Sequence, residues 1–212
     1  MHVHKRLNPA LNPAGFKKRS DFGRGRTSVH PYTKCSSCSC KVNYPLLRLR
    51  EAGHITFTIG PEQGKVYSSK HGYPCTADYG IDQISVDKLD GLIIPGGWCP
   101  DYLRRNKKFV QLVADMVHSG KLVGAICHGP WMLCSAKCIK DRRLTCFVAI
   151  KDDVENAGGI YEDSSVVIDG NLVTSRIPSD LPDFSRAVLQ VLTLQCQHSK
   201  CDMCTGDIKE KL

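Results

Sequence analysis

Two short apolar runs, each closed by a glycine turn, constrain the fold of this chain more than any other feature. DGLIIPGG over residues 90–97 ends in Pro-Gly-Gly, and GKLVGAICHG over residues 120–129 ends in Cys-His-Gly. Between the two runs, apolar side chains recur at the spacing of one helical face; they are Phe109, Leu112, Val113, Met116 and Val117. Apolar strands that alternate with amphipathic helices predict an α/β fold, in which helices cover both faces of a mostly parallel sheet.

Other segments fit the same pattern. YPLLRLREAG predicts a short helix that ends at Gly53, and HITFTIG predicts the strand after it. PWMLCSAK predicts a helix with Pro130 in its first turn. Two strands around Asp169-Gly170 indicate a hairpin, and a last helix is expected over about 180–195.

We expect one α/β domain over residues 44–195, between two segments of different composition. Residues 1–43 are rich in Pro, Gly, Ser and basic side chains without a sustained period, which predicts a basic, disordered leader. Nine Lys or Arg and one acid, Asp21, fall within residues 1–44 and account for the whole net charge of +8. The rest of the chain therefore gives no electrostatic case for a nucleic-acid partner. Residues 196–212 are expected to be a Cys-rich polar tail.

The apolar segments also limit where we expect the protein to act. No run approaches the roughly 20 apolar residues of a membrane span, and MHVHKRLNPA lacks the apolar core of a secretory signal. We therefore expect a cytoplasmic protein without a membrane partner, in which the twelve cysteines are not disulfide-linked. The spacings of Cys35/Cys38 and Cys201/Cys204 each suit half a zinc site. Because these pairs lie in opposite tails, unpaired thiols and no metal or cofactor are favoured.

The sequence AICHG over residues 125–129 has the form of a nucleophile elbow. Small residues two before and two after Cys127 would let the chain double back. The following helix would direct its free N–H groups at the thiol and favour the thiolate, and His128 would supply a base or a proton. Gly96 and Gly97 can offer bare N–H groups to a developing oxyanion. A buried cysteine beside a capping histidine is the structural alternative.

The chain resembles the ThiJ/PfpI superfamily, on the branch of PfpI-like intracellular cysteine peptidases and glyoxalase III-type enzymes. The matching stretches cover about 45–195: GPEQGKVYSSKHGYP, LDGLIIPGGWCPDYLRRN, GKLVGAICHGPWML, IKDDVENAGG and VVIDGNLVTSRIPSDLP. The resemblance implies a flavodoxin-like, three-layer α/β sandwich of the class I glutamine amidotransferase-like type. Those amidotransferases take their histidine from an H-x-E element near the C-terminus, which QHSKCDM lacks.

The resemblance also implies roles for individual residues. Cys127 would be the nucleophile and His128 its partner, and the N–H groups of Gly97 and His128 would hold the oxyanion. Asp101 would orient His128 across a subunit interface, which implies a homo-oligomer of two or more copies; a helix cap is the other interpretation of Asp101. Three further candidates for the substrate site are Gly96, Phe147 and Arg176. Phe147 stands where the peptidase branch often has Tyr, and Arg176 has a salt-bridged residue as its alternative role.

Two family features are not found in the sequence. The family has a first strand and then a Glu seven residues before the Pro that opens the first helix. Counting back from Pro45 gives Cys38, and KCSSCSCKVNYP holds no acid. GRGRTSVHPY is a poor substitute for the strand, so the first family strand is expected to be missing or replaced.

The sequence therefore predicts a cysteine-dependent enzyme that acts on a carbonyl of a small substrate or a peptide. The activity would be glyoxalase III- or deglycase-like, or peptidase-like hydrolysis, and would be weakened by the missing Glu. The alternative is a non-catalytic thiol redox sensor or stress-associated binding protein, in which Cys127 is oxidised reversibly.

Overall fold

The computed structural model describes residues 26–29, 39–69 and 72–206, with side chains described over 39–69 and 72–197. Its centre is a seven-stranded sheet in the order β10-β11-β7-β6-β1-β2-β5. The strands are β1 (Arg26–Val29), β2 (Ile55–Gly60), β5 (Tyr79–Gly80), β6 (Gly91–Ile94), β7 (Leu122–Ile126), β10 (Val166–Asp169) and β11 (Leu172–Ser175). All pair in parallel except β10, which forms the expected hairpin with β11.

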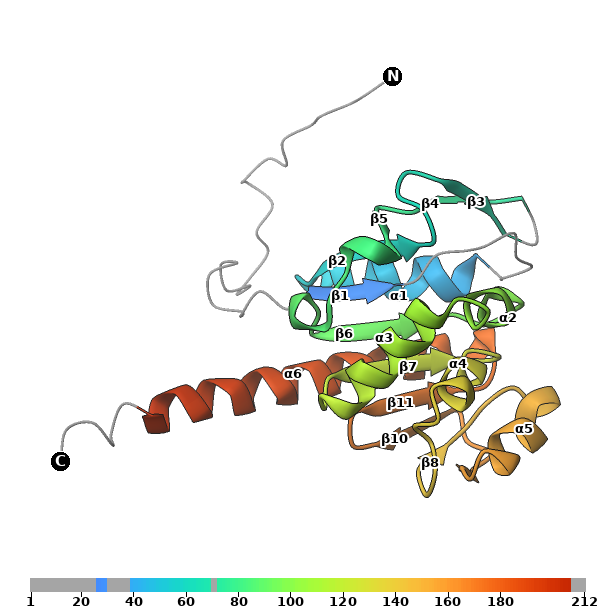
Figure 1. Ribbon diagram of the computed structural model, residues 1–212. Helices are drawn as coiled ribbons and strands as arrows, with labels where there is room; N and C mark the ends of the chain where they lie inside the picture. The colour runs from blue at the N-terminus through green and yellow to red at the C-terminus, as the bar shows by residue number, and fades with distance from the viewer. Residues whose placement is uncertain (1–25, 30–38, 70–71, 207–212) are drawn as a thin grey trace.

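Helices cover the sheet on both faces, which makes the three-layer sandwich that the sequence predicts. On one face, α1 (Cys40–Glu51) and α6 (Leu181–Gly206) pack against each other and against the sheet. On the other face lie α2 (Cys99–Leu103), α3 (Lys107–His118) and α4 (Pro130–Ser135). Figure 1 shows α3 and α4 in front of the sheet and the last turns of α6 projecting beyond it. No helix within the described ranges combines the length and the apolar character that a membrane crossing needs.

Shorter elements complete the fold outside the main sheet. An antiparallel pair is formed by β3 (Val66–Ser68) and β4 (Pro74–Thr76), and a parallel pair by β8 (Arg143–Leu144) and β9 (Ile160–Tyr161). The remaining helix is α5 (Lys151–Asn156), and the 3₁₀ turns are η1 (Ile81–Gln83), η2 (Val86–Lys88), η3 (Val148–Ile150) and η4 (Pro178–Asp180).

The neighbouring strands β6 and β7 lie in the core of the fold. Every residue of both strands is buried, as expected for parallel strands covered on both faces. Gly124 in β7 leaves room for the ring of Phe184 from α6, since a Cβ at this position would lie 3.0 Å from Phe184 Cζ. The same Cβ would lie 2.7 Å from Ile93 Cδ1. The glycine therefore allows helix and sheet to pack closely below the elbow.

The first strand of the sheet corrects two sequence-based expectations. β1 lies between β2 and β6 and pairs in parallel with both, so the strand is not missing and the leader is not structureless over Arg26–Val29. RTSV carries no strand signal, because only one of its four residues is apolar. The neighbouring strands β2 and β6 determine the conformation instead. Their backbone N–H and C=O groups that face the gap between them need hydrogen-bond partners, and β1 provides these.

The boundaries expected near residues 43 and 196 do not coincide with the ends of helices. α1 begins at Cys40, inside the expected leader, and α6 continues through Gly206, inside the expected tail. Polar composition alone does not end a helix; residues 196–205 contain neither Pro nor Gly, and the described helix includes all of them. Residues 1–25, 30–38 and 207–212 lie outside the described residues, so the interpretation of those parts of both tails stays a prediction.

Candidate active site

Cys127 adopts the strained backbone conformation that a nucleophile elbow requires. It follows the last residue of β7 and has a φ of 63°, in the left-handed region that residues with a Cβ rarely occupy. Two backbone hydrogen bonds hold it there: its N–H donates to the carbonyl of Ser175 at 2.9 Å, and its carbonyl accepts from the N–H of Phe147 at 3.0 Å. The helix α4 then begins at Pro130, as the sequence predicts.

Small residues are needed on both sides of the elbow. A Cβ at Gly129 would lie 2.6 Å from the carbonyl oxygen of Ile94, and a Cβ at Gly96 would lie 2.5 Å from Cys127 Cβ. Both contacts are shorter than van der Waals packing permits, so only glycine fits these two positions without a backbone shift. The parallel pairing of Ile94 with Ala125 is what brings the Pro-Gly-Gly turn against the Cys-His-Gly turn.

Two backbone N–H groups at this junction are suited to an oxyanion. Gly97, with a φ of 72°, continues the Pro-Gly-Gly turn, and His128 follows the nucleophile. Neither N–H donates a backbone hydrogen bond to another residue of the described ranges. The site therefore brings together four of the residues expected from the sequence: Cys127, His128, Gly96 and Gly97.

The sulfur of Cys127 has two nitrogen neighbours. His128 Nδ1 lies 3.2 Å from Sγ. The Nζ of Lys41, from the first turn of α1, donates to Sγ at 3.0 Å. Cys127 is 4% exposed and Lys41 is 5% exposed, so this contact is buried. Arranged in this way, a thiol lies between an imidazole and an ammonium group.

These neighbours decide the protonation state of Cys127. Burial by itself raises the pKa of the thiol, but the hydrogen bond with His128 and the charge and hydrogen bond of Lys41 together lower it from 9.0 to about 7. Burial is the main influence at other cysteines and raises their pKa, to about 11 for Cys75, Cys134 and Cys138. Cys127 thus differs from these three thiols, because its pKa is lowered and theirs are raised.

Lys41 is the functional residue that sequence reasoning missed. In the sequence, Lys41 is one of the nine basic residues within residues 1–44, and nothing near it indicates a function. A signal is present once the helix is extended to Cys40, because Lys41, Pro45 and Leu49 then recur every four residues on the buried face. A lysine near the N-terminus of a helix opposes the helix dipole, which also distinguishes Lys41 from a surface lysine.

Aromatic rings surround the imidazole of His128. Phe147 stacks on it, with ring centroids 5.0 Å apart and 26° between the planes. Trp131 meets it edge-on at 5.0 Å, and the indole N–H of Trp131 donates to Asp153 at 2.8 Å. Trp98 lies farther out, at 6.4 Å, and is 54% exposed. Phe147 is therefore beside the imidazole, and the exposed indole ring of Trp98 lies near it.

Asp101 and Arg176 have other partners within the chain. Asp101 lies in the first turn of α2 and forms an ion pair with Arg105. No hydrogen bond or ion pair joins Asp101 to His128 within the described part of the chain. Arg176 donates to Asp163 at 2.7 Å and to Asp180 at 3.0 Å, which fits its salt-bridged interpretation. The contact of Asp101 with a second copy stays a prediction.

The cysteines considered for zinc lie outside the side chains that the structure describes. Cys35 and Cys38 lie outside the described residues, and the side chains of Cys201 and Cys204 lie beyond those that are described. Among side chains that are described, no group of three or more His, Cys, Asp or Glu could hold a metal ion.

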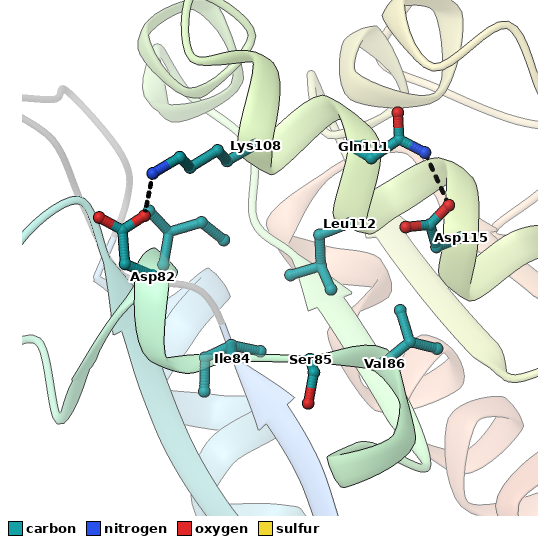
Figure 2. Close-up of a pocket in the computed structure, with 9 residues that line it drawn as sticks. Asp82, Ile84, Ser85, Val86, Lys108, Gln111, Leu112 and Asp115 are labelled. Atoms are coloured by element: carbon teal, nitrogen blue, oxygen red, sulfur yellow. Dashed lines mark hydrogen bonds and ion pairs between the residues drawn. The ribbon is translucent and has the colours of Figure 1, made fainter.

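A surface cavity of about 630 Å³ lies elsewhere, between α3 and the segment that leads into β6. Figure 2 shows Lys108 and Asp82 reaching toward each other at one end, and Gln111 bonded to Asp115 at the other. Ile84, Val86 and Leu112 contribute apolar surface. The cavity contains no residue of the elbow, so the candidate active site rests on the geometry around Cys127.

Comparisons with known proteins find one matching family and several similar proteins. The model of the DJ-1/PfpI family matches residues 37–191. The chain is 46% identical over 150 residues to protein/nucleic acid deglycase 2 of Escherichia coli, covering 70% of this chain and 87% of that protein. It is 42% identical over 149 residues to deglycase PfpI of Pyrococcus furiosus, covering 70% and 89%.

A solved structure from Anabaena variabilis, a two-domain protein with DJ-1/ThiJ/PfpI-like and ferritin-like domains, superposes with a TM-score of 0.77 at 33% identity. The match covers 80% of this chain and 48% of that two-domain chain.

Proposed function

The chain belongs to the DJ-1/PfpI family, and on that premise we propose that it is a cysteine-dependent enzyme acting on small reactive carbonyl compounds. The observation that carries the proposal is the state of Cys127. A thiol with a pKa of about 7, on a strained elbow, is a nucleophile that is partly ionised near neutral pH. Names of relatives as deglycases support carbonyl chemistry at this site.

Methylglyoxal illustrates the chemistry. The thiolate of Cys127 adds to the aldehyde carbon, a C–S bond forms, and the carbonyl electron pair moves to oxygen. The N–H groups of Gly97 and His128 would receive that oxyanion. His128 then moves a proton from the aldehyde carbon to the neighbouring carbonyl carbon, which converts the hemithioacetal into a thioester.

Water closes the cycle by hydrolysing the thioester to lactate and free thiol. The aldehyde carbon loses two electrons and the neighbouring carbon gains them, so the reaction balances without an external oxidant. Deglycation would use the same first adduct, formed from a carbonyl already attached to an amine. Hydrolysis of a peptide bond would need the same oxyanion site. It is the third proposed activity, after conversion of methylglyoxal and deglycation.

We expect turnover to be slower than in a relative with a carboxylate beside the sulfur. A positioned acid–base group contributes about 10²–10⁴-fold, and the group that contacts Cys127 here is the Lys41 ammonium. An ammonium stabilises the thiolate but does not accept a proton while it is charged.

The experiment that tests the proposal is a lactate-formation assay with methylglyoxal. Cys127→Ser should abolish turnover. Cys134→Ser is the matched control, because Cys134 is a partly buried free thiol on α4 with a raised pKa. Loss of activity in both variants, or in neither, would argue against Cys127 as the nucleophile.

A thiol redox sensor is the second candidate, and the Lys41 contact favours it. A thiolate beside a cation reacts readily with peroxide to give a sulfenic acid. Peroxide-dependent oxidation of Cys127 without turnover of methylglyoxal, a glycated amine or a peptide would support the sensor over the enzyme.

A further inference from the structure

Among the described residues, the ammonium of Lys41 is paired with a thiol and with no carboxylate. Its hydrogen bond runs to Cys127 Sγ, and no ion pair to Asp or Glu is found for it within the described residues. The sequence around it agrees, since residues 22–50 contain no Asp or Glu. His128, the other neighbour of the sulfur, also favours negative charge there. The immediate surroundings of the reacting atom are therefore neutral or positive.

A buried ammonium needs an anion close by, because removing it from water without a partner is costly. In the free protein the Cys127 thiolate is that anion. When sulfur forms a bond to the substrate carbon, it becomes a neutral thioether and Lys41 loses its partner. A negative charge on the substrate, on a group near enough to the attacked carbon to reach Nζ, would restore the pairing, because Nζ lies only 3.0 Å from Sγ.

From this geometry we propose that Lys41 makes the site select electrophiles that carry an anionic group, with carbonyl compounds bearing a carboxylate or phosphate as the substrate class. The substrate part of this inference rests on the proposed function, whereas the charge selectivity of the thiol does not. Lys41 is then a specificity-determining residue, which acts through its charge on groups attached to the reacting carbon.

The selectivity can be measured without turnover, by comparing alkylation of Cys127 with iodoacetate and with iodoacetamide. In both reactions the thiolate displaces iodide and forms a C–S bond, so the ratio of the two rate constants does not depend on the fraction of thiolate. Peptide mapping isolates Cys127 from the other cysteines. The same protein unfolded in urea gives the reference ratio for a thiol free of Lys41.

The iodoacetate-to-iodoacetamide ratio should be about tenfold higher in the folded protein than in the unfolded one, from attraction at short range in partly buried surroundings. Lys41→Met should lower the ratio to the unfolded value or below, and Lys41→Arg should preserve it. Lys107→Met, which removes an exposed positive charge on α3, is the matched control and should leave it unchanged. A folded wild-type ratio no higher than the unfolded one would overturn the inference, and this comparison needs no variant to fold.

Turnover then tests the substrate class. The phosphorylated 2-oxoaldehyde 3-phosphooxy-2-oxopropanal should have a higher kcat/KM than methylglyoxal, which lacks the phosphate, and Lys41→Met should reverse that order. Equal kcat/KM values would overturn the substrate class and leave the proposed function intact. Turnover of neither compound, with a raised alkylation ratio, would contradict the proposed function and leave an anion-selective thiol.

Discussion

Gly96 approaches Cys127 so closely that a Cβ on Gly96 would lie 2.5 Å from Cys127 Cβ and 2.9 Å from the backbone nitrogen of His128. The contact joins the ends of β6 and β7 and sets the distance between the thiol and the N–H groups expected to bind the oxyanion. A pair of adjacent strand ends therefore positions Cys127 next to the N–H groups proposed to bind the oxyanion.

Gly96→Ala should abolish carbonyl turnover per folded molecule and destabilise the protein by about 1–3 kcal/mol, because the new methyl group overlaps backbone and Cβ atoms. Gly120→Ala is the control, since Gly120 has a positive φ but no atom within 4 Å of an added Cβ. Gly120→Ala should lower the free energy of unfolding through backbone strain alone and should keep carbonyl turnover. Urea unfolding and the lactate assay measure the two effects; full activity in Gly96→Ala would contradict the close contact.

The rate at which iodoacetamide modifies Cys127 should rise with pH through a midpoint near 7 and then level off, because the thiolate is the reacting species and the pKa of Cys127 is lowered to about 7. Cys146, whose pKa is raised to about 12 mainly by burial, should show no such plateau below pH 9. Mass-spectrometric peptide mapping over pH 5–10 gives both curves. A midpoint near 9 for Cys127 would show that Lys41 and His128 do not stabilise the thiolate.

The same pKa shift predicts a change in stability with pH. The folded pKa of Cys127 is about 7 and its ordinary value is 9.0, so the folded state holds this proton less tightly than the unfolded state. The resulting stabilisation is fully present above about pH 9, is lost as pH falls toward 7, and is on the order of 2 kcal/mol. Urea unfolding of wild type and Cys127→Ser at pH 6 and 9 isolates it. A difference between the two proteins that does not grow with pH would contradict the prediction.

Phe147→Ala should lower kcat about tenfold, because the ring of Phe147 stacks on His128 and fixes the plane of the imidazole. Phe147→Tyr keeps the stacking ring and should stay within about threefold of wild type. Steady-state assays with methylglyoxal measure both variants, and circular dichroism checks their folding. An unchanged kcat in Phe147→Ala would mean that Trp131 suffices to hold the imidazole.

Mixing two inactive variants tests the proposed role of Asp101 in a homo-oligomer. If Asp101 orients His128 of a second copy, Asp101→Asn and Cys127→Ser should each lose activity, and mixed oligomers should recover part of it. In a 1:1 mixture, about a quarter of the activity is expected, because one kind of site then combines two intact residues. Arg105→Met, which removes the partner of Asp101 within the chain, is the control. No recovery after subunit exchange would place the action of Asp101 within one copy.

Thr27→Pro should destabilise the fold by about 3 kcal/mol or more, because β1 is bonded to strands on both sides and proline cannot donate to either. Ser28→Ala, which keeps the backbone N–H, is the control and should have a much smaller effect. Thermal unfolding measures the difference. Equal stability of the two variants would show that β1 contributes nothing to the stability of the sheet.

The sequence predicted the elements whose pattern lies within a few neighbouring residues. The apolar runs that became β6 and β7, the helical face from Phe109 to Val117 and the turn at Asp169 each carry their pattern within a few residues. The elbow belongs to this group, because the small residues around Cys127 are a local steric requirement and the resemblance to the ThiJ/PfpI superfamily rests on the same motif.

Tertiary structure decided what depends on residues far apart in the chain. RTSV becomes an interior strand because β2 and β6 leave a place where both offer unpaired backbone groups. Four mostly polar residues carry no local pattern that predicts this. Lys41 reaches Cys127, 86 residues away, because α1 packs beside β1 with its buried face over the end of the sheet. Whether a lysine is a solvated charge or the partner of a thiolate depends on burial and on the nearest atom, and both are set only when the helix and the sheet come together.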